Sequence, residues 1–130
     1  MDLNINELLG KQLVSITGRT GDDAMTFTTS NGEEYQLYHE QDCWESVSIE
    51  EIIGDLGDLI NSTIVEAEEV HGGDDPAGWE PGEYTDSYTW TFYKLRTANG
   101  CVTIRWLGES NGYYGESVSF TKLKKGRNEN

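Results

Sequence analysis

The fold is indicated most strongly by residues 86–107, which read DSYTWTFYKLRTANGCVTIRWL. Two runs rich in aromatic and β-branched residues flank Asn99-Gly100, a pair that strongly favours a tight hairpin turn. A two-residue turn at these positions places Leu95 opposite Ile104 and Tyr93 opposite Trp106. Because alternate residues of a strand share one face, these side chains form the expected core face of a β-hairpin.

The opposite face of this hairpin combines aromatic rings with cations. Its residues are Trp90, Phe92, Lys94, Arg96 and Arg105. Stacking on a ring and contact with a cation are what a nucleotide-like anion requires, so this face is a candidate ligand site. Alternatively, a helix at about Ile49 to Ile60 covers this face, and the acids of that helix pair with the cations.

Five further strands are expected, at residues 11–19, 24–29, 34–39, 63–70 and 117–123, where apolar and polar residues alternate. The strands at 24–29 and 34–39 flank a turn that contains Asn31-Gly32. A three-residue loop with a bulge at the glycine pairs Phe27 with Tyr35, which keeps the apolar residues on one face.

Over residues 41–61, the spacing of the apolar residues changes from that of a strand to that of a helix. Ser48 is a possible helix cap with Glu51 three residues later, apolar residues then recur at helical spacing, and Gly54 and Gly57 interrupt the pattern. The sequence therefore predicts one α+β domain over residues 1–130, with a core at about 10–123. We expect a mostly antiparallel sheet of six to seven strands, one short broken helical segment, an acidic loop at 71–85 and a frayed basic tail at 122–130.

The chain has a formal net charge of −15, and no basic residue lies between Thr20 and Tyr93. Such a charge excludes direct binding to nucleic-acid phosphates. It serves either for solubility or for contact with a basic protein partner that normally holds nucleic acid. Residues of the predicted acidic face are Asp55, Asp58, Glu66, Glu68, Glu69, Asp74, Asp75, Glu80 and Glu83. Tyr113 and Tyr114, flanked by glycines, are candidate aromatic contacts, or else fold back onto the core.

Several other classes of protein find no support in the sequence. No apolar run of about 20 residues predicts a membrane span, and no secretion signal is visible, so a cytoplasmic location is expected. Cys43 and Cys101 are expected to be free thiols, and their spacing from His39 and His71 fits no zinc motif. No hydrolase or phosphate-binding motif occurs either. We therefore expect no enzyme activity, catalytic residue, metal or cofactor.

Three stretches are distinctive: Gln41-Asp42-Cys43, the run GDLGDLIN at 54–61 followed by Glu68-Glu69, and SNGYYG at 110–115. Together they resemble a family of small acidic phage and prophage proteins of uncharacterised function. The resemblance covers about residues 10 to 117. The chain departs from the family pattern at Asn61, where a glycine is usual, and at Trp44, where a second cysteine is common. The resemblance implies a phage context.

Together, the acidity and the resemblance lead to three hypotheses. The first is a non-enzymatic, anti-CRISPR-like phage inhibitor whose acidic surface mimics nucleic acid and occupies a bacterial defence enzyme in the host cytoplasm. The second is a binding module that sequesters a small anionic ligand, such as a nucleotide signal, on the aromatic and cationic face. The third is a structural or interaction protein.

Overall fold

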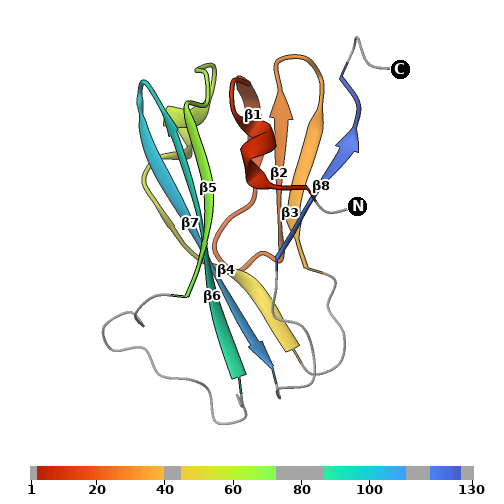
Figure 1. Ribbon diagram of the computed structural model, residues 1–130, viewed down its shortest axis with the longest axis vertical. Helices are drawn as coiled ribbons and strands as arrows, with labels where there is room; N and C mark the ends of the chain where they lie inside the picture. Colours follow the sequence, from red (N-terminus) through yellow and green to blue (C-terminus); the bar gives the residue numbers. More distant parts are fainter. Residues whose placement is uncertain (1–2, 40–44, 73–86, 111–117, 127–130) are drawn as a thin grey trace.

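The protein is a sandwich of two four-stranded antiparallel sheets (Figure 1). A computed structural model describes residues 3–39, 45–72, 87–110 and 118–126. The first sheet has the order β1-β2-β3-β8, formed by β1 (Leu13–Thr17), β2 (Ala24–Thr29), β3 (Glu34–Tyr38) and β8 (Ser119–Lys124). The second has the order β4-β7-β6-β5, formed by β4 (Glu45–Ile53), β5 (Glu66–His71), β6 (Ser87–Thr97) and β7 (Gly100–Ser110). Two short 3-10 helices, η1 (Ile5–Leu8) and η2 (Leu56–Leu59), complete the described elements.

The predicted α+β class is wrong, because the described residues contain eight strands and no α-helix. The region expected to be helical is mostly β4. Val47 and Ile49 alternate into the core as in any strand, but the pairing with β7 then shifts, so that Glu50 is the extra residue of a bulge. The next inward residue is therefore Ile52, opposite Ile104. The bulge converts a two-residue period into a spacing of three, which resembles that of a helix.

The β6–β7 hairpin is confirmed, but its register differs by two residues from the predicted one. Leu95 lies opposite Val102 and Tyr93 opposite Ile104, so the turn consists of Ala98 and Asn99. Thr97 explains the shift, since its hydroxyl accepts a hydrogen bond from the Asn99 N–H (3.1 Å). Because the difference is even, each side chain keeps its predicted face, and the core face is correct.

The β2–β3 hairpin has the predicted register, with Phe27 opposite Tyr35. Both rings enter a single core that lies between the sheets and also contains Tyr93 and Trp106. Phe120 of β8 stacks on the Tyr35 ring, with the ring centroids 5.4 Å apart. Burying this many aromatic rings in one cluster supplies the main stabilising term of the fold.

None of the helices in the described part of the chain is long or apolar enough to cross a membrane.

Candidate functional site

Three of the predicted acids lie on β5, at the edge of the second sheet (Figure 1). Glu66 accepts a hydrogen bond from Arg96 Nη2 at 2.6 Å, and Glu69 accepts one from the Tyr93 hydroxyl at 2.6 Å. Glu68 lies opposite Lys94 in the register, and its side chain forms no ion pair with a described residue. We call these three residues the acidic edge. The carboxylates of Glu66 and Glu68 are exposed and remain accessible to a partner. The Glu69 side chain is 31% exposed, and its second oxygen lies 3.2 Å from His71 Nε2.

The ion pair between Glu66 and Arg96 lies in solvent. The hydrogen bond and the positive charge of Arg96 lower the pKa of Glu66, and the same contact raises the pKa of Arg96. The side chains of Glu66 and Arg96 are 62% and 49% exposed, so water and salt screen their attraction. A cationic partner can therefore compete with Arg96 at little cost.

Asp55 and Asp58 lie on η2, beside the turn between β6 and β7. The Asp55 Oδ1 atom accepts the Gly57 N–H at 2.9 Å, which caps this short helix. The backbone oxygen of Asp58 accepts the Thr97 hydroxyl at 2.5 Å, which fixes η2 to the hairpin. Glu66 pairs with Arg96, next to Thr97, so these three acids share one end of the second sheet.

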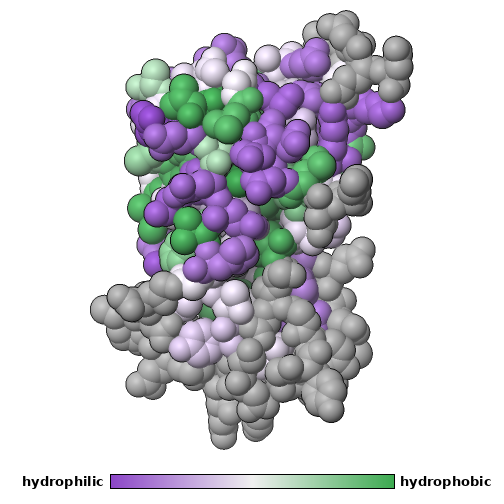
Figure 2. Space-filling view, in the orientation of Figure 1, coloured by the Kyte–Doolittle hydropathy of each residue, from purple (hydrophilic) through white to green (hydrophobic). Residues whose placement is uncertain are grey.

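Hydrophilic side chains extend across the described part of the face shown in Figure 2, with smaller hydrophobic areas between them. The remaining predicted contacts lie outside the described residues. They are Asp74, Asp75, Glu80 and Glu83 of the predicted loop and the two aromatic residues Tyr113 and Tyr114.

The aromatic and cationic face of β6 and β7 exists, and acids of the segment that was expected to be helical pair with its Arg105. Arg105 binds the carboxylates of Glu50 and Glu51 at 2.5 and 2.6 Å, and its guanidinium lies 5.3 Å from the centre of the Trp90 ring. The expected covering helix is wrong, because the acids that pair with Arg105 belong to the neighbouring strand β4. An anionic ligand at Arg105 would have to displace both carboxylates.

The other residues of this face are arranged along β6. Arg96 binds Glu66 of β5, Lys94 is exposed, and Phe92 is half-buried opposite Val70. Trp90 is only 2% exposed, so little of its ring is available for stacking on a ligand.

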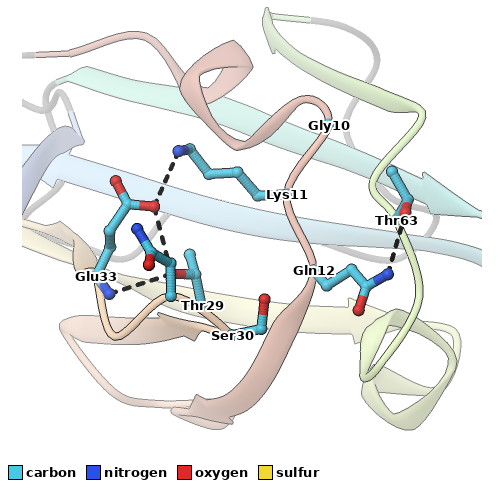
Figure 3. Close-up of a pocket in the computed structure, with 8 residues that line it drawn as sticks. Gly10, Lys11, Gln12, Thr29, Ser30, Glu33 and Thr63 are labelled. Atoms are coloured by element: carbon cyan, nitrogen blue, oxygen red, sulfur yellow. Dashed lines mark hydrogen bonds and ion pairs between the residues drawn. The ribbon is translucent and has the colours of Figure 1, made fainter. Parts of the chain in front are cut away.

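A buried carboxylate that the sequence analysis missed lies at the start of β3. Glu33 is 3% exposed and accepts a hydrogen bond from the Lys11 ammonium at 2.9 Å (Figure 3). It accepts another from the Tyr35 hydroxyl, also at 2.9 Å. Lys122 of β8 forms an ion pair with it at 2.9 Å, and the Thr29 hydroxyl lies 3.3 Å away. From the sequence, Glu33 is only the residue that follows the Asn31-Gly32 turn, because its two lysines are remote in the chain and no local spacing reveals them.

The surroundings of Glu33 keep it ionised. Burial by itself raises the pKa of the carboxyl, but hydrogen bonds from Lys11, Lys122 and Tyr35 outweigh burial and lower the pKa to about 2. Burial lowers the pKa of Lys11, whereas the hydrogen bond to Glu33 raises it, and the net change is a rise. A carboxylate with both oxygens occupied and so low a pKa cannot exchange protons near neutral pH, so it fits a structural role and not general acid–base catalysis.

An open hollow of about 450 Å³ adjoins this cluster (Figure 3). Hydroxyl, amide and charged groups line it, including Lys11, Gln12, Thr29, Ser30, Glu33 and Thr63. Gln12 Nε2 donates to the Thr63 hydroxyl at 3.4 Å, which links the residue before β1 to the segment that precedes β5. The carboxylate of Glu33 at this hollow is already paired with two lysines.

Thiols and metal ligands are sparse in the described segments. Cys101 is a free, exposed thiol, and Cys43 lies outside these segments. No group of three or more histidine, cysteine or acidic side chains within them is close enough to hold a metal ion.

Comparison with other proteins identifies a family without a known activity. Neither the curated proteins nor the solved structures contain a significant match to this chain. The model of a family described as "Domain of unknown function (DUF7448)" matches residues 6–120, which is most of the sequence. The chain therefore belongs to this family of domains of unknown function.

Proposed function

We propose that this protein is a non-enzymatic inhibitor, and that its second sheet, which carries the acidic edge, binds a basic protein. The partner class that best suits this charge is a nucleic-acid-binding enzyme of bacterial defence, and the phage resemblance of the sequence favours such a target in the host cytoplasm. The carboxylates would occupy the surface that normally holds phosphates.

The observation that carries the proposal is the unequal distribution of charge between the two sheets. Strands of the first sheet contain one acidic and two basic residues. Strands of the second contain seven acidic and three basic residues, a formal charge of −4. Asp55 and Asp58 add to the same side. A one-sided field of this sign steers a basic partner toward the second sheet and accelerates its association.

The acidic edge is suited to mimic phosphates in a further respect. Glu66 and Glu68 lie two residues apart on one strand, so their side chains point to the same face at a spacing of about 7 Å. Neither carboxylate is buried, so a lysine or arginine of the partner can reach them without unfolding any element.

The test compares two double charge reversals in assays against purified bacterial restriction and CRISPR effector enzymes. Glu66→Lys/Glu68→Lys changes the acidic edge, whereas Asp23→Lys/Glu34→Lys makes the same change in net charge outside the second sheet. We expect the wild-type protein and the control to block DNA binding by the target enzyme. The edge variant should weaken inhibition at least roughly tenfold, since each desolvated charge contact contributes about 1 kcal/mol or more.

Salt provides the second measurement. Raising salt from about 50 to 200 mM shortens the range of the field, so the association rate constant for the wild-type protein should fall. Equal inhibition by both double variants, with no effect of salt, would show that the acidity serves only solubility. Loss of inhibition on Arg105→Ala but not on Glu66→Lys/Glu68→Lys would favour the ligand-binding alternative.

A further inference from the structure

One edge of the second sheet is a regular strand, β5, whose outer side bonds to no described segment. β5 pairs with β6 through six consecutive residue pairs, from Glu66–Arg96 to His71–Thr91, without a bulge. η1 lies beside β5 but donates no backbone hydrogen bond to it, and no other described segment does so along its outer side. We propose that the partner inhibited by this protein adds an extended basic segment to this edge as a fifth strand, an inference that rests on the proposed function.

The other three edge strands are each closed by a different device. β4 bonds to the segment before β2, through the Ile49 N–H to Asp22 oxygen contact at 2.8 Å, and it carries the bulge at Glu50. β1 has a shifted register and accepts the Asn61 N–H at the Leu13 oxygen at 2.7 Å. β8 accepts the Leu3 N–H at the Phe120 oxygen at 2.7 Å. Occupied backbone groups and bulges oppose the addition of a strand, and the described residues show neither along the outer side of β5.

The backbone groups available on β5 follow from the alternation of an antiparallel ladder. The Gly72 N–H donates to the Trp90 oxygen at 2.9 Å, so the residues of β5 that bond to β6 are the even-numbered ones. The N–H and C=O groups of Ala67, Glu69 and His71 therefore point away from the sheet. Three donors and three acceptors in one row are sufficient for strand addition.

Charge selects the occupant of this edge. An added strand places its side chains about 5 Å from those of Glu66 and Glu68, a distance at which opposite charges attract and like charges repel. A second copy of this chain would bring its own acidic edge into the same position, so self-pairing is opposed. A segment that alternates lysine or arginine with small polar residues satisfies both the backbone groups and the carboxylates.

The probe is an end-capped eight-residue peptide of alternating lysine and threonine, titrated into the full-length protein at low salt. Amide hydrogen exchange then reports on each N–H of β5. We expect exchange at Ala67, Glu69 and His71 to slow at least roughly tenfold when the peptide binds, because these N–H groups become hydrogen-bonded. A peptide with the same charges but with every backbone nitrogen methylated cannot complete the ladder and should bind at least roughly tenfold more weakly.

A matched pair of proline variants tests the same edge from the protein side. Ala67→Pro removes one outward N–H without changing charge or the bonds to β6, and proline is tolerated at a strand edge in this orientation. Ala98→Pro makes the same exchange in the β6–β7 turn, at a position that favours proline. Ala67→Pro should weaken the unmethylated peptide by about tenfold, and Ala98→Pro should not weaken it.

The outcomes separate this inference from the proposed function. Strand addition is wrong if the methylated peptide binds as tightly as the unmethylated one, or if binding leaves the three amides unprotected. It is also wrong if the unmethylated peptide does not bind while charge reversal still abolishes enzyme inhibition. In each case the proposed acidic inhibitor stands. If charge reversal has no effect on inhibition, the proposed function falls, whatever the peptide does.

Discussion

Glu33 and Glu66 are carboxylates of the two opposing sheets, with side-chain exposures of 3% and 62%. Glu33 is surrounded by two lysines, a tyrosine and a threonine, whereas Glu66 has a single arginine on one side and solvent on the other. The pKa is lowered in both, but for different reasons. At Glu33 several hydrogen bonds overcome burial, and at Glu66 one exposed arginine acts alone.

The comparison shows that a strongly acidic composition says little about any individual acid. The protein uses one carboxylate to join β3 to β8 and to the segment before β1. It leaves those of the acidic edge at the surface, where they contribute charge but little packing. Substitutions at the two places should therefore affect different properties. Those at Glu33 should lower stability, and those on β5 should weaken binding.

The largest effect is expected for Glu33→Ala. The change leaves Lys11, Lys122 and the Tyr35 hydroxyl without their shared acceptor, and should reduce the free energy of unfolding by roughly 2–4 kcal/mol. Glu34→Ala, one residue further along and partly exposed, serves as the control and should change it by less than about 0.5 kcal/mol. Chemical denaturation of both variants measures the difference, and equal stabilities would mean that the cluster around Glu33 is not structural.

A somewhat smaller effect is expected from acid. The pKa of Glu33 is lowered from 4.5 to about 2 on folding, so its contribution is complete above about pH 5 and is lost as the pH falls through 2. The stability advantage of the wild-type protein over Glu33→Gln should therefore shrink by roughly 2–3 kcal/mol across this window. Denaturation curves at several pH values test this, and an advantage that is constant with pH would contradict the lowered pKa.

The smallest effect on stability should come from the acidic edge. In Glu66→Gln/Glu68→Gln, the exposed ion pair with Arg96 is lost, but the repulsion among neighbouring acids falls as well. We expect the melting temperature to change by less than about 2 °C, because exposed pairs contribute little. A fall as large as that of Glu33→Ala would show that the edge holds the sheet together and is not reserved for a partner.

Much of the strand content could be predicted from the sequence, because alternation and turn residues are local signals. The β2–β3 register followed from the requirement that Phe27 and Tyr35 share a face. The β6–β7 register differed because Thr97, through its side chain, moved the turn back toward Ala98, and turn propensity alone does not include such a bond. The predicted helix failed for a related reason, since a bulge at Glu50 is invisible until β7 is known to lie alongside.

The candidate site divides in the same way. A strand that carries Glu66, Glu68 and Glu69 could be predicted from the local alternation, but its place at the edge of a sheet could not. Acids of residues 49–60 were expected to pair with the cations of β6 and β7, but the strand pairing that brings Glu50 and Glu51 beside Arg105 was not, because it depends on which strands are neighbours. The cluster around Glu33 was also missed, since it joins residues 11, 33 and 122, and only the completed first sheet brings these together.

The position of Lys122 has a consequence for the order of folding. β3 and β8 are adjacent in space but separated by most of the chain, so the first sheet is closed by a contact of very high sequence separation. Such contacts form late and slow the overall rate. Until β8 is in place, Glu33 lacks Lys122, one of the two lysines that pair with it. On the ribosome, Lys122 emerges 89 residues after Glu33, so this ion pair cannot form while the chain is shorter.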